Sequence, residues 1–246
     1  MDQKDIVHIT AVTQVRPDGE KCTQAVIEYK EKIEPSMLEP DSFEVKDRTI
    51  IRIESESNKV TLHLDEKDKE APTLCPGMPW KGSYASLKDA KVLVRQKKEI
   101  RTQDGRILEK TDEWIESDQT CNKEEELFIQ MAYQKQSYNL YIPKDYDPKK
   151  KYPLVQFIHD AGACGKDTRL ALAQGRGALV WASPEVQKEH PCFVFAPQFD
   201  GPPIVDDDWN VDERLEDAKA ALDNILELYS IDRNRIYTTG QSMGCM

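Results

Sequence analysis

The sequence contains no apolar run long enough for a membrane-spanning helix and no excess of positive charge. Asp and Glu number 45 against 34 Lys and Arg, so the formal net charge is −11. A membrane span needs about 20 mainly apolar residues, and an acidic surface repels phosphate backbones and anionic lipids. We therefore expect no nucleic-acid partner and no membrane partner.

Metal and cofactor motifs are also missing. The six cysteines show no C-x-x-C spacing, which disfavours a zinc site and a redox pair and predicts free thiols. Gly162 and Gly165 lack the G-K-[ST] ending of a phosphate-binding loop. We expect no metal and no cofactor, and we interpret Cys164, between these glycines, as a bystander thiol because no activating group adjoins it in the sequence.

The first five residues are polar and acidic and include no apolar h-region, so no signal peptide is expected in this chain. Localisation stays open. The protein is extracellular or periplasmic if a leader has been removed, and cytoplasmic otherwise.

Residues 6–115 show short runs with period-2 alternation, separated by turn signals such as Asp104-Gly105. Strands are expected at 25–29, 49–53, 60–64 and 91–95, and no helical periodicity competes with them. Repeated short strands without helices are typical of an immunoglobulin-like β-sandwich. This pattern predicts such a sandwich at 1–115, followed by an acidic linker at 116–125.

Residues 126–246 alternate strands with helices. A hairpin is expected at 127–133 and 137–141, buried strands at 154–158 and 192–196, and a strand at 236–239. Apolar residues at helical spacing predict a helix over 210–229, with Asn210 and Glu213 as a capping box. This order predicts a parallel-rich, doubly wound sheet.

The sequence G-x-S-x-G surrounds Ser242, directly after the strand expected at 236–239. In α/β-hydrolases this pattern forms the nucleophile elbow, a strained strand-to-helix turn that needs glycines on both sides of the serine. Ser242 is therefore the predicted catalytic nucleophile, and residues 126–246 are interpreted as the N-terminal part of an α/β-hydrolase domain.

The histidine and the acid of such a triad follow the serine in chain order, and no histidine follows Ser242 here. His8 and His63 are expected in strands and His190 in a loop. His159 ends a buried strand and is interpreted as a structural residue that shapes the next loop, with the triad base as its less favoured alternative. The simplest interpretation is a chain truncated after the elbow, inactive by itself, with acid and base beyond residue 246.

Several segments in the second region resemble bacterial two-domain carboxylesterases related to polyhydroxybutyrate depolymerases and feruloyl esterases. The matching segments are YNLYIP at 138–143, YPL at 152–154, HDAG at 159–162, WASPE at 181–185, PCFVFAPQ at 191–198, DRNRIY at 232–237 and GQSMG at 240–244. The N-terminal region is similar to the immunoglobulin-like domain of some of these esterases, through Phe43-Glu44-Val45 and Arg48-Thr49-Ile50.

The resemblance implies an oxyanion hole made by the backbone N–H groups of Met243 and Ala161. Asp160 stands where the family has glycine. A carboxylate near a developing negative charge opposes catalysis unless it points away, and a glycine conformation would strain aspartate. On this basis Asp160→Gly is expected to preserve or raise turnover.

Two further features have alternative interpretations. Trp209 either lines a substrate pocket or packs against the start of the following helix. Asp206-Asp207-Asp208 suits a solvated loop before a helix N-terminus better than a hard-cation site.

The favoured function is that of a serine carboxylesterase acting on small-molecule or polysaccharide-linked esters, with the sandwich positioning the active site or mediating a homo-oligomer. The alternatives are a peptidase of the prolyl-oligopeptidase kind and a non-catalytic or carbohydrate-binding chain. No propeller-like repeat precedes the hydrolase region, which argues against the peptidase.

Overall fold

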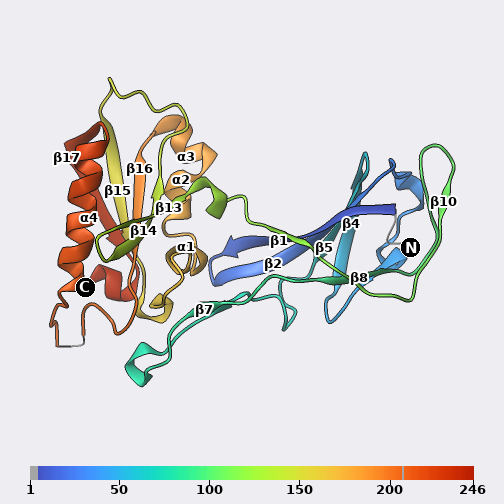
Figure 1. Cartoon of the computed structure of the whole chain (residues 1–246), viewed down its shortest axis with the longest axis horizontal. Helices are drawn as coiled ribbons and strands as arrows, with labels where there is room; N and C mark the ends of the chain where they lie inside the picture. The colour runs from blue at the N-terminus through green and yellow to red at the C-terminus, as the bar shows by residue number, and fades with distance from the viewer. Residues whose placement is uncertain (1–4, 207) are drawn as a thin grey trace. The chain divides into compact units, whose positions relative to one another are not determined.

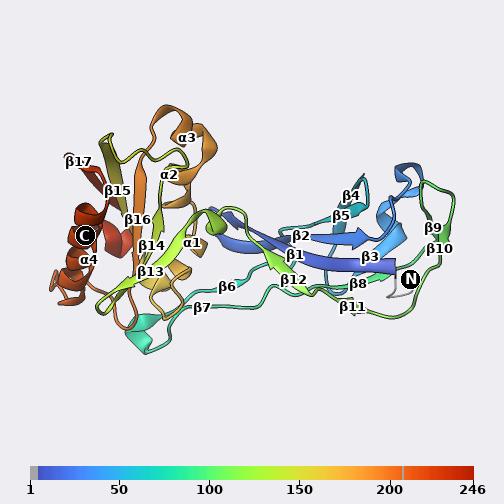
Figure 2. The same cartoon turned by 45° about the horizontal axis from the view of Figure 1, so that its top comes forward.

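A computed structural model describes residues 5–206 and 208–246, which form two compact units (Figures 1 and 2). The first unit comprises Met1–Gln14, Lys21–Thr73 and Asp89–Asn122; the second comprises Val15–Glu20, Leu74–Lys88 and Lys123–Met246. Residues 1–4, on which the signal-peptide expectation rests, and Asp207 lie outside the described residues. The domain bounds 1–115, 116–125 and 126–246 stay a prediction.

The first unit is built from short strands, and no α-helix precedes Leu170 in the part of the chain that is described. One sheet has five strands in the order β12-β1-β2-β5-β4, a second has three in the order β11-β8-β3, and β9 and β10 form a two-stranded hairpin. Their bounds are Ile6–Arg16 (β1), Gly19–Tyr29 (β2), Phe43–Val45 (β3), Ile50–Glu56 (β4), Lys59–Leu64 (β5), Leu93–Gln96 (β8), Ile100–Arg101 (β9), Ile107–Leu108 (β10), Ile115–Glu116 (β11) and Gln119–Cys121 (β12).

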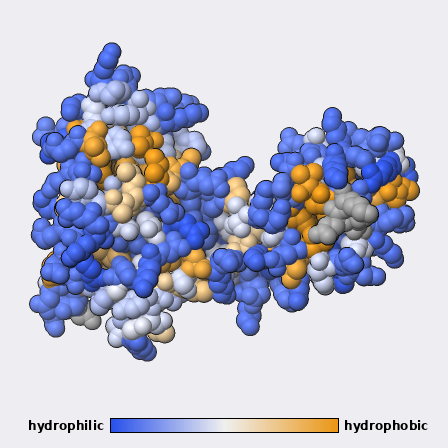
Figure 3. Space-filling model, in the orientation of Figure 1, coloured by the Kyte–Doolittle hydropathy of each residue, from blue (hydrophilic) through white to orange (hydrophobic). Residues whose placement is uncertain are grey.

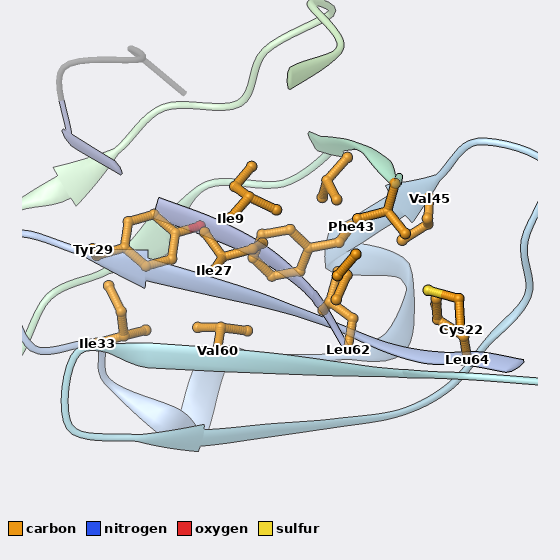
Figure 4. Close-up of a cluster of buried hydrophobic side chains, with 14 of the residues drawn as sticks. Ile9, Cys22, Ile27, Tyr29, Ile33, Phe43, Val45, Val60, Leu62 and Leu64 are labelled. Carbon is orange, nitrogen blue, oxygen red and sulfur yellow. The ribbon is translucent and has the colours of Figure 1, made fainter. Parts of the chain in front are cut away.

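A single hydrophobic core lies between the sheets of this unit (Figure 4). Ile27 and Leu62 from one sheet and Phe43 and Val94 from the other are at most 3% exposed. Alternation of buried and less buried residues along β5 places every second side chain in this core. The strands predicted at 49–53, 60–64 and 91–95 are confirmed, with ends shifted by up to three residues. The strand predicted at 25–29 is the last part of β2, which begins six residues earlier, at Gly19.

Part of the range expected as a linker is ordered. Residues Gln119–Cys121 form β12, which pairs in parallel with β1, and Thr10 lies opposite Gln119. The acidic composition of 116–125 did not predict this pairing. A three-residue edge strand can keep its polar side chains in solvent, so it needs no apolar residues that would mark it in the sequence.

The second unit contains a five-stranded sheet in the order β13-β14-β16-β15-β17. Its strands are Ile129–Tyr133 (β13), Gln136–Tyr141 (β14), Tyr152–Ile158 (β15), Phe193–Gln198 (β16) and Ile231–Gly240 (β17). The sheet is mixed: β13–β14 and β14–β16 are antiparallel, whereas β15–β16 and β15–β17 are parallel. The expectation of a parallel-rich sheet is therefore correct only for β16, β15 and β17. The pair β13–β14 is antiparallel because a tight turn joins the two strands, and β14 also runs antiparallel to β16.

Helices cover both faces of this sheet (Figure 1). Val155 and Phe157 pack with Leu172 and Leu179 on one face, while Leu154 packs with Ile225 on the other. The helices are Leu170–Ala173 (α1), Leu179–Ala182 (α2), Pro184–Glu189 (α3) and Arg214–Leu228 (α4). The unit also includes the antiparallel pair Leu74–Cys75 (β6) and Ser86–Leu87 (β7).

Helix α4 begins later than its apolar spacing predicts. The expected capping box at Asn210 is absent; Asn210 instead donates its backbone and side-chain N–H groups to Asp206. Val211 is 61% exposed, and the helix starts at Arg214. The helical spacing of apolar residues continues into the loop before Arg214, where the chain does not form a helix.

Within the described residues, no helix combines the length and apolarity that a membrane crossing requires. Hydrophilic residues cover most of the face seen in Figure 3, with smaller apolar areas between them.

Candidate active site

Strand β17 ends in a sharp turn that carries Ser242. Gly240 is the last strand residue, Gln241 is extended, and a 3₁₀ turn covers Ser242–Cys245. Ser242 has a φ of 49°, a left-handed conformation that non-glycine residues rarely adopt. Its side chain is exposed. The hydroxyl is therefore presented to solvent at the carboxyl end of a parallel strand.

The two glycines of the motif are required by close backbone approaches. A Cβ on Gly240 would lie 2.2 Å from the Gly244 carbonyl oxygen, and one on Gly244 would lie 2.1 Å from the Ile158 carbonyl oxygen. Neither neighbour is a flexible side chain. The turn can therefore close against β15 only with glycine at both positions.

The segment after β15 lies beside this turn. Ile158 pairs with Gly240, and the Gln241 N–H donates to the Ile158 carbonyl at 3.1 Å. The next residues form a 3₁₀ turn, Ala161–Ala163, that lies against the turn at Ser242–Cys245. The structure thus brings together Ser242, Met243 and Ala161, three of the four predicted site residues.

His159 is completely buried and uses both ring nitrogens for backbone hydrogen bonds. Nε2 accepts the Phe199 N–H at 3.0 Å, so Nδ1 carries the proton and donates to the Asp160 carbonyl at 2.7 Å. Burial lowers the pKa of His159 to about 4. A neutral, fully engaged imidazole cannot take a proton from Ser242, which agrees with the structural role predicted for it.

This buried imidazole should make stability depend on pH. The unfolded chain protonates His159 near pH 6.5 and the folded chain near pH 4, so the unfolded state binds more protons in this window and stability falls as the pH falls through it. The loss should approach about 3 kcal/mol at pH 4. Urea unfolding at pH 7 and pH 4 measures this loss of unfolding free energy. The His159→Gln protein, whose side chain keeps a donor and an acceptor but does not titrate, should lose less stability between the two pH values. Equal losses in both proteins would contradict this.

The other three histidines are placed elsewhere. His8 and His63 lie in β1 and β5 of the first unit, as predicted, and contact Asp118 and Glu54 at 2.7 and 2.9 Å. His190 ends α3 just before β16. Because β16 and β17 both run parallel to β15, His190, which precedes β16, lies at the opposite end of these strands from Ser242, which follows β17.

Asp160 corrects the expectation of a strained residue. Its φ of −75° and ψ of 168° are ordinary extended values. The carboxylate turns into the loop and caps the 3₁₀ turn by accepting the Ala163 N–H at 2.9 Å. Burial raises the pKa of this carboxyl, opposed by the N–H groups of Ala163 and Gly162. Asp160 therefore organises the loop that the sequence suggested it would disturb.

This geometry reverses the expected effect of changing Asp160. Asp160→Gly or Asp160→Ala removes the cap, which typically costs about 0.5–2 kcal/mol, and loosens Ala161. For the esterase activity that the sequence predicts, we expect turnover of p-nitrophenyl acetate by the full-length protein to fall about tenfold. Asp160→Asn keeps an oxygen acceptor and should stay within about threefold of wild type. Unchanged or faster turnover with glycine would restore the original expectation.

The backbone N–H groups of Ala161 and Met243, both near Ser242, have no acceptor within the described residues. The Met243 side chain is 3% exposed and packs with Ile158, Cys164 and Ile204. Its sulfur accepts the Ile204 N–H at 3.3 Å. The packing of its side chain thus fixes the position of Met243, whose backbone N–H directly follows Ser242.

Trp209, the fourth predicted site residue, lies at an exposed loop tip. Its side chain is 64% exposed, its φ is 63°, and its N–H donates to the Asp206 carbonyl at 3.0 Å. No contact with Ser242 or with α4 is described for it. Asp207, at the centre of the acidic triplet, is outside the described residues.

Two glutamines that the sequence did not single out hold the loop after β15. Gln174, at the end of α1, accepts the Asp160 N–H at 3.0 Å. Gln198, at the end of β16, donates to the Ala163 and Gly165 carbonyls at 2.9 and 3.0 Å. Gln198 is the last residue of the segment PCFVFAPQ, one of those that resemble the carboxylesterases. Its role is visible only in the structure, where its amide group reaches the carbonyls of the loop.

The cysteines are all free thiols, and three of them, Cys22, Cys164 and Cys192, are buried. Burial raises the pKa of Cys164 to about 11, so this thiol is protonated at neutral pH despite its place beside the loop. Among the residues described, no group of three or more His, Cys, Asp or Glu side chains is arranged to hold a metal ion.

Comparison with known proteins yields matches to esterases. Residues 8–109 match the family model of the esterase immunoglobulin-like N-terminal domain. The solved structure of a thermostable esterase is 32% identical, with a TM-score of 0.88 over 96% of this chain and 71% of that one. No curated protein matches the sequence.

Two other solved structures match only in part. One is a mutant of the feruloyl esterase module from Clostridium thermocellum complexed with sinapinate, with 18% identity and a TM-score of 0.35 over 48% of this chain and 45% of that one. The other is a ferulic acid esterase from the anaerobic fungus Anaeromyces mucronatus, with 20% identity and a TM-score of 0.32 over 48% and 49%.

Proposed function

We propose that this chain, which belongs to the family of esterases with an immunoglobulin-like N-terminal domain, hydrolyses carboxylic esters through an acyl-enzyme formed on Ser242. The observation that carries the proposal is the backbone at Ser242: φ 49°, an exposed hydroxyl, and glycines whose Cβ atoms could not be accommodated. A nucleophile elbow requires these features. On this proposal the second unit is the N-terminal part of an α/β-hydrolase domain.

The N–H groups of Met243 and Ala161 serve as the oxyanion hole in this mechanism. They belong to two adjoining turns and have no acceptor in the described residues. When Ser242 Oγ attacks the ester carbonyl, negative charge develops on the carbonyl oxygen, and two prearranged donors stabilise it without reorganisation. The triad histidine accepts the Oγ proton and gives it to the departing alcohol as the acyl-enzyme forms, and water activated by the same histidine then releases the acid and restores Ser242.

We place the base and the acid of the triad outside residues 1–246. This is supported by the histidines: His159 is buried with both nitrogens engaged, and His190 lies at the opposite end of the parallel strands from Ser242. It is also supported by β17, an edge strand whose Tyr237 is 55% exposed, whereas its neighbour β15 is almost entirely buried. Further strands could pair with this edge.

Labelling with an organophosphate tests the assignment. The full-length enzyme should lose ester turnover as one molecule of reagent attaches, and peptide mass mapping should locate it on Ser242. EDTA should leave turnover unchanged, because no step uses a metal. Labelling at another residue, or much faster cleavage of proline-containing peptides than of short-chain esters, would overturn the proposal.

The chain of residues 1–246 alone should be inactive toward p-nitrophenyl acetate above background. Without a base, Ser242 is an ordinary alcohol, and loss of the triad histidine typically removes several orders of magnitude in rate. The measurement compares the purified 1–246 chain with the full-length enzyme. Turnover by the shorter chain that Ser242→Ala abolishes would show that a base lies within it.

A further inference from the structure

A hairpin from the N-terminal half of the sequence packs on the loop that follows β15. The 74–88 hairpin consists of β6, β7 and a tip with a 3₁₀ turn at Pro79–Lys81. Its residues fall within the range matched by the immunoglobulin-like family model, yet their contacts group them with the second unit.

Two backbone hydrogen bonds join this hairpin to the loop. The Gly77 N–H donates to the Gly162 carbonyl at 2.8 Å, and the Ala85 N–H donates to the Cys164 carbonyl at 2.8 Å. One accepting carbonyl lies within the 3₁₀ turn Ala161–Ala163 and the other directly follows it. Ala85 is 7% exposed, so at least this bond is shielded from solvent.

Two close backbone approaches, one between the loop and the hairpin and one within the hairpin, leave no room for a side chain at Gly165 or Gly77. A Cβ on Gly165 would lie 2.6 Å from the Ala85 carbonyl oxygen, and a Cβ on Gly77 would lie 2.6 Å from the Ala85 nitrogen. The hairpin can close only with glycine at position 77, and the loop can pack against the hairpin only with glycine at position 165. The contact is therefore backbone on backbone, with little freedom to slide.

We propose that the 74–88 hairpin is a positioning element for the oxyanion hole. Gln174 and Gln198 hold the loop from the side of the sheet and α1, and the hairpin holds the Gly162 and Cys164 carbonyls from outside. With these carbonyls fixed, the Ala161 N–H stays aimed beside Ser242. A donor contributes to catalysis only if it is oriented before charge develops, so the hairpin should act on turnover more than on substrate binding.

The inference rests on the proposed esterase function, and it is tested by removing one donor. Ala85→Pro deletes the N–H that bonds Cys164. Lys88→Pro is the matched control, because Lys88 is exposed in the same segment and its N–H makes no hydrogen bond among the residues described. Gly77→Ala, which forces the hairpin open, is the second variant. All are made in the full-length enzyme.

Ala85→Pro and Gly77→Ala should lower kcat for p-nitrophenyl acetate by about 10- to 100-fold with KM within about twofold, as expected when an oxyanion donor is misplaced. Hydrogen exchange should become faster in residues 159–165. Lys88→Pro should match wild type in both readouts. The inference is wrong if kcat and loop exchange in both hairpin variants equal those of the control, or if KM alone changes.

The two proposals fail in different ways. If wild-type enzyme does not hydrolyse esters, or does so with Ser242→Ala, the proposed function fails. If wild-type activity depends on Ser242 and the hairpin variants are fully active with an unchanged loop, only the positioning role fails.

Discussion

Replacement of Ser242 by alanine is expected to lower kcat/KM of the full-length enzyme for p-nitrophenyl acetate by about 10⁴-fold or more. The hydroxyl is the only proposed nucleophile, and deletion of the serine in a triad removes nearly all of the covalent pathway, leaving only the contribution of the oxyanion hole and of binding. The left-handed backbone at Ser242 is consistent with this role, because strain of that kind persists where the surrounding structure enforces it.

Steady-state kinetics and organophosphate labelling measure the effect. Ser36→Ala is a suitable control, because Ser36 is exposed in the first unit and its hydroxyl makes no hydrogen bond in the described part of the chain. The Ser242→Ala protein should neither turn over nor take up label, with an unchanged melting temperature. Retention of more than about a hundredth of wild-type activity would exclude Ser242 as the nucleophile.

Gly244→Ala is expected to lower kcat/KM by about 100-fold or more and to lower the melting temperature. The added Cβ would lie 2.1 Å from the Ile158 carbonyl oxygen and 2.7 Å from its carbon. Both are backbone atoms of β15, so either the strand end or the turn must move. A displacement of about 1 Å at a catalytic group can cost about 100-fold in rate, and such overpacking typically costs 1–3 kcal/mol.

Gly105→Ala separates the clash from the general effect of replacing glycine. Gly105 has a φ of 93°, but a Cβ there would meet nothing within 4 Å, and the residue lies in the turn between β9 and β10 of the first unit. We expect a stability loss of roughly 1–2 kcal/mol from the left-handed backbone and near wild-type kcat/KM. If Gly105→Ala and Gly244→Ala reduce kcat/KM equally, the close approach to Ile158 does not govern the site.

Much of the site could be predicted from residues adjacent in the sequence. The G-x-S-x-G pattern after an apolar strand located Ser242, because the turn needs glycines at fixed local positions. His159 was correctly interpreted as structural, and the structure adds the reason: the Phe199 N–H and the Asp160 carbonyl occupy its two nitrogens. Asp160 was interpreted wrongly, because a comparison of residue types does not show where a side chain points.

The sequence by itself determined the two kinds of architecture, the positions of the main strands along the chain and the identity of the proposed nucleophile. These depend on short-range properties: period-2 alternation, apolar runs and glycines that relieve local strain. Only the tertiary structure decided how the loop beside Ser242 is held. Gln174, Gln198 and the 74–88 hairpin come from segments distant in the chain, and they act mostly through backbone carbonyl and N–H groups. Every residue but proline carries both groups, so no pattern of side chains identifies which of them will meet.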